Sequence, residues 1–488
     1  MPSIVSSITA GGEFLLLLGG EWKKSSSGRT VEVRSPHSRE LIGRIQQAAK
    51  GEIDIAFSEA FRAQKIWAEI PAVDRAGVMQ RAAAIIRENK EELSQILVRE
   101  ISKPKKLADD EVLRTAELLE YSAEEGKRIS GEIVHGDSLP GGKRNKVSLV
   151  ERVPLGVVVA ISPFNYPINL AASKIGPALV AGNSVVFKPA TQGSVSGLYL
   201  AEVFVRAGLP KGCLSAMTGR GSEIGDYLVT HPKASAVYFT GGTPTGMRIA
   251  KSSGMIPLLL ELGGKDAAII LPDANVEETA KAIVSGAFSY SGQRCTAVKR
   301  VLTIDGDSTG ERVVSLVAEL AGKLTVGRPE DDSDITNLID DGAAEYVWEL
   351  IEEARKLGAI PLNELKREGS LIHPVVFDRV PLESRLAWEE PFGPVLPVIR
   401  VKSVAEAVEI ANKSEYGLQA SVFTENIDRA FEIARALEVG TVQINGKPAR
   451  GPDNFPFVGA KSSGIGAQGI RYSIENLTRL KSTVLNLR

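Results

Sequence analysis

Short apolar runs alternate with longer amphipathic windows through the chain from residue 153 onward. Each run is followed by a window with helical spacing, and a parallel sheet covered by helices on both faces gives this alternation. Right-handed crossovers then predict a doubly wound α/β fold. Four runs are typical of buried strands: Val157–Ile161, Ser184–Phe187, Leu214–Met217 and Ala236–Phe239.

The same pattern starts again after Gly263 and Gly264. Ala267–Leu271 predicts a strand and Val276–Ser289 a helix, and further strand–helix alternation follows between residues 395 and 444. We therefore expect a second α/β unit, with a ligand cleft near the junction of the two units. The first 125 residues are dominated by helical patterns, in Ile53–Trp67, Arg75–Glu100 and Asp109–Glu125.

Two segments fit neither unit. Residues 127–150 are rich in glycine and basic residues and suggest a hairpin excursion, and Leu480–Leu487 alternates as an exposed strand would. An unpaired strand edge invites pairing with another chain. Pairing of these two segments across an oligomer interface is therefore one hypothesis.

Composition narrows the classes of function. Lys and Arg number 58 and Asp and Glu 60, so the formal charge is −2, which argues against a nucleic-acid scaffold or a polybasic membrane binder. The longest early apolar run, Phe14–Leu18, is far shorter than the roughly 20 residues of a spanning helix, and no basic region precedes it. We expect a cytoplasmic protein. Two cysteines cannot form a Cys-rich metal site.

One of the two cysteines, Cys295, lies in the segment SGQRCT at 291–296. A free thiol has a pKa of about 8.5 and is mostly protonated at neutral pH. Arg294 beside it, or a helix N-terminus beneath it, would raise the thiolate fraction. A buried structural cysteine is the alternative. None of the four histidines lies in a glycine-rich segment or another segment typical of a catalytic site, so nothing in the sequence favours a Cys–His hydrolase.

Two polar residues could complete a site around that thiol. Glu261 interrupts an apolar run before a double glycine, where a carboxylate could act as a general base; a strand-end glutamate satisfied by backbone donors is the alternative. Asn165 follows the strand Val157–Ile161, at the edge where such folds bind ligands. Its amide could donate to a developing oxyanion, although asparagine is also common in turns.

Two further strand ends suit a nucleotide. The segment FTGGTPTG at 239–246 leads from a strand into a helix, where glycine backbone can approach a phosphate. It is neither G-x-G-x-x-G nor a Walker loop, and a plain tight turn is the alternative. Lys188, followed by Pro189, should project from its strand end toward a bound nucleotide, unless it is only an edge lysine.

Together these segments resemble the aldehyde dehydrogenase superfamily over nearly the whole chain. The motifs occur in the family's order: Asn165, Lys188, the Gly241–Gly246 loop, Glu261, Cys295 and Glu390 in EEPFGP. The resemblance implies an α/β fold of two doubly wound parallel-sheet domains with a small β oligomerisation arm. It places a cofactor-binding domain at 1–126 and 151–261, a catalytic domain at 262–469, and the arm at 127–150 and 470–488.

The resemblance also implies roles. Cys295 would attack the aldehyde, Asn165 and the Cys295 N–H would form the oxyanion hole, and Glu261 would activate water to hydrolyse the thioester. No metal is needed, because the thiol supplies covalent catalysis and the dinucleotide removes the electrons. The residues implied in dinucleotide binding are Ile161, Ser162, Phe164, Lys188, Thr191, Gly221, Gly225, Phe239, Thr240, Gly241, Thr243, Glu390 and Phe392.

The choice of cofactor can be argued from charge. Relatives that prefer NAD often carry a glutamate near the adenine ribose, at the position of Thr191. A carboxylate there would repel a 2′-phosphate, whereas neutral Thr191 and cationic Lys188 would accept one. We therefore expect a preference for NADP, with NAD as an alternative.

The windows around Arg114, Tyr166, Arg294 and Arg450 are similar to the NADP-dependent non-phosphorylating glyceraldehyde-3-phosphate dehydrogenases. There the matching side chains would hold the substrate phosphate, because arginine forks match phosphate geometry. We expect oxidation of glyceraldehyde 3-phosphate to 3-phosphoglycerate by a homo-oligomer, dimer or tetramer, without nucleic-acid or membrane partners. The alternatives are a general or semialdehyde dehydrogenase acting on non-phosphorylated aldehydes, and a non-catalytic relative that only binds dinucleotide.

Overall fold

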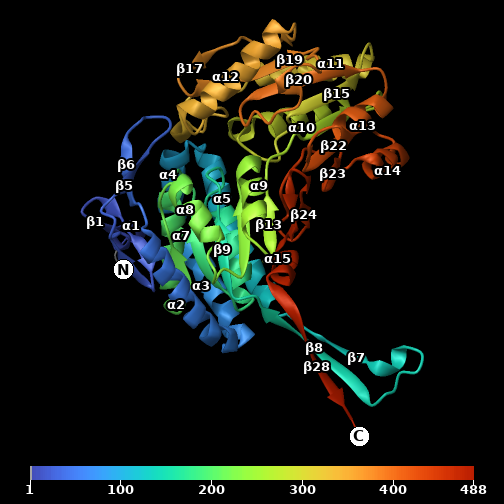
Figure 1. The fold of residues 1–488 in the computed structure, drawn as a ribbon. Helices are drawn as coiled ribbons and strands as arrows, with labels where there is room; N and C mark the ends of the chain where they lie inside the picture. Colours follow the sequence, from blue (N-terminus) through green and yellow to red (C-terminus); the bar gives the residue numbers. More distant parts are fainter. Residues whose placement is uncertain (1–2, 488) are drawn as a thin grey trace.

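A computed structural model describes residues 3–487. Two large sheets with their helices form the body, and a narrow three-stranded arm projects from one end of it (Figure 1). No helix within the described residues is both long and apolar enough to cross a membrane.

The first sheet has the strand order β26-β13-β12-β9-β10-β11-β3-β4. The chain runs from β9 through β10 to β11 on one side, then returns to β12 and β13 on the other. The carboxyl ends of β9 and β12 therefore form a topological switch point, where such folds bind ligands. The parallel strands are β9 (Val157–Ile161), β10 (Ser184–Lys188), β11 (Leu214–Ala216), β12 (Ala236–Thr240) and β13 (Leu258–Glu261).

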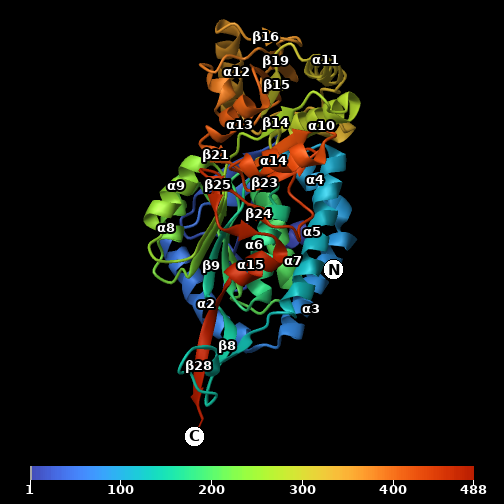
Figure 2. The ribbon, with the colours of Figure 1, turned by 90° about the vertical axis from the view of Figure 1, so that its right-hand side faces the viewer.

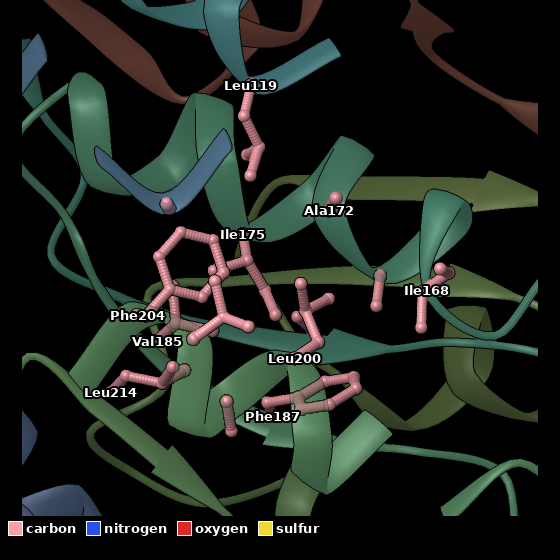
Figure 3. Close-up of a cluster of buried hydrophobic side chains, with 14 of the residues drawn as sticks. Leu119, Ile168, Ala172, Ile175, Val185, Phe187, Leu200, Phe204 and Leu214 are labelled. Atoms are coloured by element: carbon pink, nitrogen blue, oxygen red, sulfur yellow. The ribbon is translucent and has the colours of Figure 1, made fainter. Parts of the chain in front are cut away.

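Both faces of this sheet are buried, as its continuous apolar strands predicted. Val158 and Ala160 of β9 pack in one hydrophobic cluster, and Val157 and Val159 pack in another on the opposite face. Figure 3 shows the first cluster, in which Phe187 of β10 lies among side chains of two helices. This face is covered by α6 (Asn169–Val180) and α7 (Ser194–Arg206) with α3 (Ala72–Glu88) and α5 (Lys105–Gly126). The other face is covered by α2 (Lys50–Glu69), α8 (Gly221–Val229) and α9 (Thr243–Ser252).

The second sheet has the order β16-β19-β20-β15-β14-β22-β23 and is also doubly wound. Its parallel strands are β14 (Ala267–Ile270), β15 (Arg300–Ile304), β19 (Val375–Asp378), β20 (Val395–Val401), β22 (Gln419–Phe423) and β23 (Thr441–Ile444). Its helices are α10 (Val276–Phe288), α11 (Ser308–Gly322), α12 (Asp341–Lys356), α13 (Val404–Asn412) and α14 (Ile427–Ala436). Short paired strands complete this part: β17 (Arg367–Glu368), β18 (Leu371–Ile372), β21 (Tyr416–Gly417), β24 (Phe457–Val458), β25 (Ala460–Lys461) and β27 (Ala467–Gln468).

The sheets differ from the prediction at three edges, both edges of the first sheet and one edge of the second, where the pairing is antiparallel. In the first sheet β26 (Gly464–Ile465) and β3 (Leu16–Leu18) join antiparallel, and β4 (Glu21–Lys23) extends β3. In the second, β16 (Ile360–Pro361) pairs antiparallel with β19. The strand β26 lies in the range predicted for the catalytic domain, yet it completes the first sheet. The chain therefore crosses back between the two units.

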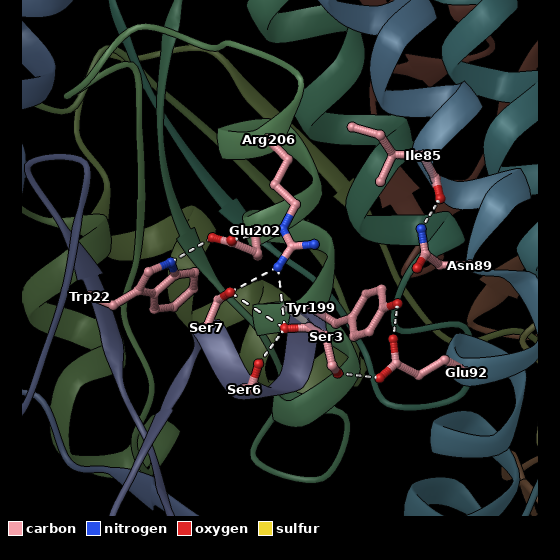
Figure 4. A network of polar contacts seen from close by, with 10 residues as sticks. All are labelled: Ser3, Ser6, Ser7, Trp22, Ile85, Asn89, Glu92, Tyr199, Glu202 and Arg206. Atoms are coloured by element: carbon pink, nitrogen blue, oxygen red, sulfur yellow. Dashed lines mark hydrogen bonds and ion pairs between the residues drawn. The ribbon is translucent and has the colours of Figure 1, made fainter. Parts of the chain in front are cut away.

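The N-terminal region contains strands that the helical patterns did not predict. Beside β3 and β4, a separate four-stranded sheet has the order β1-β2-β6-β5, built from Thr9–Ala10, Glu13–Phe14, Leu41–Gln46 and Thr30–Arg34. The short helix α1 (Ile4–Ser7) is fastened to α7, where Arg206 donates to Ser7 Oγ (2.8 Å) and to the Ser3 carbonyl (3.2 Å) (Figure 4).

The single helical window predicted at Arg75–Glu100 is two helices, α3 (Ala72–Glu88) and α4 (Lys90–Ile101). Asn89 between them leaves helical geometry, and its side chain donates to the Ile85 carbonyl at 2.8 Å (Figure 4). Asparagine competes with the helix for backbone groups in this way. The third predicted helix is α5 (Lys105–Gly126).

The arm consists of β7 (Glu132–His135), β8 (Lys146–Pro154) and β28 (Thr478–Asn486), with β8 in the middle. The hypothesis that the two segments pair across an oligomer interface is corrected, because β8 and β28 pair antiparallel over nine residues within one chain. The predicted arm began at residue 470, but Ile470–Asn476 is helix α15, which packs on α5 and α6 in the body (Figure 2).

Candidate active site

A cavity of about 620 Å³ opens at the carboxyl ends of β9, β10 and β12. Its walls come from both units, as the sequence predicted, and they include Asn165 and Cys295. Two of the predicted dinucleotide residues, Thr191 and Thr243, are not part of its lining. The other eleven line it: Ile161, Ser162, Phe164, Lys188, Gly221, Gly225, Phe239, Thr240, Gly241, Glu390 and Phe392.

Cys295 lies in a turn between the short 3-10 helix η2 (Ser289–Gly292) and β15, and it is partly exposed. The backbone that leads to it is constrained, because Tyr290 and Ser291 both have a φ of 53°, a conformation that costs free energy outside glycine. Gly292 has a φ of 72°, and a Cβ there would lie 2.3 Å from the Gly393 carbonyl oxygen. The turn that presents the thiol is therefore fixed by its surroundings.

The electrostatics of the thiol differ from the sequence-based expectation. Burial raises the pKa of Cys295 to about 11, Lys299 acts to lower it, and Glu261, Glu390 and Asp266 act to raise it. Arg294, expected to favour the thiolate, donates instead to the Ser285 and Gly286 carbonyls at the end of α10. No helix begins at Cys295 in the described chain.

Asn165 lies in the loop after β9 and is almost fully buried. Its Nδ2 donates to the Gln293 carbonyl at 2.8 Å, which ties this loop to the turn that carries the nucleophile. One N–H of the amide remains for an oxyanion. Asn165 and Cys295 both line the cavity.

Glu261 is the last residue of β13 and is only 6% exposed. Its Oε2 accepts from Thr240 Oγ1 at 3.2 Å and from Arg450 Nη1 at 3.3 Å, whereas Oε1 has no hydrogen-bond partner. The carboxylate is thus held by side chains rather than by backbone donors. It lies beside the cavity, next to Thr240 in its wall.

Sequence reasoning missed Lys174, which is fully buried in α6. Its Nζ donates to Thr240 Oγ1 at 2.6 Å, so that Lys174, Thr240 and Glu261 form one chain of hydrogen bonds. Burial lowers the pKa of Lys174 to about 7. The signal was present, since Lys174 is the one charged residue in the apolar segment NLAASKIGPALV.

The cavity walls suit a dinucleotide. Gly242 is the N-cap of α9, so the amides at the start of that helix are available to a phosphate. Gly221 and Gly225 have open space where a Cβ would lie, which leaves room against α8. Lys188 is buried at its strand end, and burial lowers its pKa to about 8. An anion beside this lysine would favour its charged form.

Glu390 and Phe392 line the cavity near the nucleophile. Glu390 accepts from the Gly264 N–H at 3.3 Å and forms an ion pair with the buried Lys299. Phe392 packs edge-to-face on Phe164, with ring centroids 5.9 Å apart. Glu390 and Phe392 come from the second unit and Phe164 from the first, so the cavity joins the two units.

The two predicted dinucleotide residues outside the lining lie close by. Thr243 Oγ1 donates to the Ser462 carbonyl and accepts from the Gly263 N–H. Thr191 Oγ1 donates to the Gly219 carbonyl at 3.4 Å, one residue from Ala190 in the wall.

The four predicted substrate residues are only partly brought together. Arg114 donates to both carboxylate oxygens of Asp453 and, through Nη2, to the Arg450 carbonyl at 2.7 Å. Arg450 contacts Glu261 and Gln468. The Tyr166 ring faces the Lys103 ammonium, 3.6 Å from its centroid. Arg294, as described above, is engaged at the end of α10.

The residues 3–487 contain no group of three or more His, Cys, Asp or Glu side chains arranged to hold a metal ion. At the cavity or beside it lie the Cys295 thiol, the Asn165 amide and the Glu261 carboxylate.

Comparison with protein-family models matches residues 22–483 to the "Aldehyde dehydrogenase family". The chain belongs to this family. It is 54% identical over 470 residues to an NADP-dependent glyceraldehyde-3-phosphate dehydrogenase of Streptococcus equinus, a match that covers 96% of this chain and 98% of the relative. It is 50% identical over 486 residues to the enzyme so named in Pisum sativum, covering 99% and 97%.

A solved structure shows the same arrangement. The NADP-dependent glyceraldehyde-3-phosphate dehydrogenase from Bacillus halodurans C-125, complexed with NADP, is 51% identical and superposes with a TM-score of 0.96. The match covers 97% of this chain and 99% of that one. The predicted α/β aldehyde dehydrogenase fold is therefore confirmed, with the antiparallel edges described above.

Proposed function

We propose that this chain oxidises glyceraldehyde 3-phosphate irreversibly to 3-phosphoglycerate, with NADP as the electron acceptor. The observation that carries the proposal is that Cys295 and Asn165 line one cavity and Glu261 lies beside it, bonded to Thr240 in the cavity wall, in a chain about half identical over nearly its full length to enzymes with that name. General or semialdehyde oxidation is the runner-up, and it would use the same three residues.

In this proposal Cys295 Sγ attacks the aldehyde carbon, and the carbonyl oxygen becomes an oxyanion that accepts from Asn165 Nδ2 and the Cys295 N–H. Removal of one such donor typically costs about 3–4 kcal/mol of transition-state stabilisation. NADP, when bound, accepts the hydride, which leaves a thioester on Cys295. Glu261 then takes a proton from the water that attacks the thioester, through its unpartnered Oε1.

The preference for NADP is supported by two residues near the adenine end of the cavity. Lys188 provides a buried cation at the end of β10, and Thr191 provides a neutral side chain where a carboxylate would repel a 2′-phosphate. Glu390 would hold the nicotinamide ribose hydroxyls at the other end of the cavity, with Phe392 beside it. Thr243, at the start of α9, would contact the pyrophosphate.

The substrate phosphate would be held by guanidiniums from two segments. Arg114 of α5 and Arg450 lie together, joined by the hydrogen bond from Arg114 to the Arg450 carbonyl. Tyr166 and Arg294 complete the proposed clamp, and for Arg294 this requires a side-chain rotamer different from the one bound to α10. Each guanidinium can donate two parallel hydrogen bonds to a phosphate, which suits these arginines to binding a phosphate dianion.

We also propose a separate role for each unit of the molecule and for the arm. The first unit binds the dinucleotide, the second supplies the nucleophile, and the arm associates copies of the chain into a dimer or tetramer. The outer edge of β28 is unpaired and several apolar side chains of the arm are exposed, which supports association there. Both cysteines are free thiols, which fits the cytoplasm.

The proposal is tested by absorbance at 340 nm with NADP and glyceraldehyde 3-phosphate, in phosphate-free buffer, beside acetaldehyde and succinic semialdehyde. A kcat/KM for the phosphorylated substrate tens-fold above the other two is expected. Comparable rates with acetaldehyde would favour the runner-up. Cys295→Ser should abolish oxidation while dinucleotide binding persists, and retained turnover would remove Cys295 as the nucleophile.

A further inference from the structure

Lys299, four residues after the nucleophile, makes contacts near the site but has no role in the proposed function described above. Its side chain is 2% exposed, and its Nζ donates to the Cys295 carbonyl oxygen at 2.6 Å. The same ammonium forms an ion pair with Glu390 in the cavity wall. A buried ammonium is costly unless it is paired, so these two partners fix Lys299 between the nucleophile turn and the cavity.

The thiol of Cys295 needs such a cation. A thiolate is the reactive form, yet burial and the neighbouring carboxyl groups oppose it at this position. Arg294 is engaged with the carbonyls of α10, and a turn rather than a helix N-terminus carries Cys295. Lys299 acts in the opposite direction to burial, and it is attached to the Cys295 peptide itself.

We propose that Lys299 is a positioning residue for the nucleophile. It holds the Cys295 peptide through its carbonyl oxygen and places a positive charge behind the thiolate, and Glu390 moderates that charge. Lys299 is not among the residues that line the cavity, and it acts through these two residues. The inference rests on Cys295 as the nucleophile of the proposed function.

Other charged groups face the same region and belong to the local field. The Asp266 backbone carbonyl accepts from the Lys299 backbone N–H at 2.9 Å, and burial raises the pKa of the Asp266 carboxyl to about 7. Burial lowers the pKa of Lys265 well below its usual range, with Arg300 and Lys299 acting in the same direction. The Glu261 carboxylate acts to raise the pKa of the Cys295 thiol, and Cys295 in turn acts to raise the pKa of Lys174. Because of these neighbours, the test changes one charge at a time.

The experiment measures the rate at which iodoacetamide alkylates Cys295 in the full chain, without dinucleotide, from pH 6 to 10. Lys299→Met removes a positive charge, so the pKa of the thiol rises and the rate at a given pH falls about tenfold, the equivalent of one pKa unit. Lys299→Arg keeps the charge and should restore most of the rate. Glu390→Gln removes a negative charge and should shift the profile to lower pH, with faster alkylation.

Controls separate charge from access and background. Cys295→Ser gives the background from Cys213, which is buried and whose pKa burial raises to about 12. Lys447→Met removes a nearby cation that bonds Ser285 on α10, and it should leave the profile unchanged. Steric obstruction alone would not give opposite shifts in the Lys299 and Glu390 variants.

An alkylation profile of Lys299→Met equal to that of the wild type would overturn the inference, as would slower alkylation of Glu390→Gln. If Lys299→Met does not fold, Lys299→Arg and Glu390→Gln still decide the question. Failure of the proposed function has a different signature, because aldehyde oxidation would then persist in Cys295→Ser whatever the alkylation results.

Discussion

At the scale of single residues, Arg450 makes contacts in the proposed site with both its backbone and its side chain. Its backbone carbonyl accepts from Arg114, and its guanidinium contacts Glu261 and Gln468 while lying over the Phe457 ring, 5.3 Å from the centroid. Substrate anion and catalytic carboxylate would therefore share one cation. In the proposed function, the side chain that binds the substrate phosphate would also orient the base.

Arg450→Ala should raise KM for glyceraldehyde 3-phosphate about tenfold or more, because a charged hydrogen-bonded partner contributes about 1.5–3 kcal/mol. The KM for propanal, which has no phosphate, should change far less. Steady-state kinetics with both substrates measure the difference, and Arg450→Lys is the matched control that keeps the charge but loses the fork. Equal effects on both substrates would contradict the phosphate clamp.

The sequence drew attention to the principal site residues through their local patterns. Glu261 ends an apolar run, Asn165 follows one, and Cys295 lies in a polar segment between a helix and a strand. The structure places Asn165 and Cys295 in the wall of one cavity and Glu261 beside it. The direction of the Arg294 side chain could not be predicted, since it depends on the carbonyls of α10. Lys299 was missed for the same reason, because its partner Glu390 is 91 residues away in the chain.

At the scale of elements, a buried ion pair fixes the loop that carries Asn165. Lys103 and Glu111 pair with both side chains fully buried. Lys103 Nζ donates to the Asn165 carbonyl at 2.7 Å, and Glu111 Oε1 accepts the N–H groups of Ile168 and Asn169 at 3.1 Å. The two charges thus hold the middle of the loop between β9 and α6 and its end at α6.

Lys103→Met should lower the free energy of unfolding by about 3–5 kcal/mol, because it leaves the Glu111 carboxylate buried and unpaired. The double variant Lys103→Met/Glu111→Leu should be more stable than Lys103→Met alone, since both charges are then removed. Urea denaturation of the three proteins measures this. A loss below 1 kcal/mol in the single variant would show that the loop does not depend on the pair.

The long elements were predictable and the short ones were not. The strand β9 has the predicted bounds, because its apolar run is continuous and buried. Strands of two or three residues, such as β1 and β3, are too short for any periodicity to identify them. The break at Asn89 depends on a single side-chain hydrogen bond, which the helical spacing around it concealed.

At the scale of the whole molecule, the arm stands apart from the body (Figure 1). Leu480 and Val484 lie on the same face of β28 and are 61% and 54% exposed. Apolar side chains exposed on a sheet edge mark an association surface. The strand that carries Leu480 and Val484 pairs with β8 along its length, so these two side chains have fixed positions on the arm.

The double variant Leu480→Lys/Val484→Lys should shift the protein to a smaller assembly at micromolar concentration, because four or more like charges would meet at the interface. Light scattering after size-exclusion chromatography measures the mass. Met255→Lys, a substitution at a fully exposed position of the body, is the matched control and should keep the wild-type mass. An unchanged mass in the double variant would place the interface elsewhere.

The return of the chain to its first sheet makes this protein a poor candidate for division into two separately produced halves. A fragment that ended at Glu261 would lack β26, and the edge of β13 would be open at Leu260 and Glu261. It would also lack α15, whose Ile470 and Ile474 cover α5 and α6. Two separately produced fragments would therefore associate only if β26 and α15 of the C-terminal fragment docked onto the N-terminal fragment. Despite its two sheets, the chain is expected to fold as one unit.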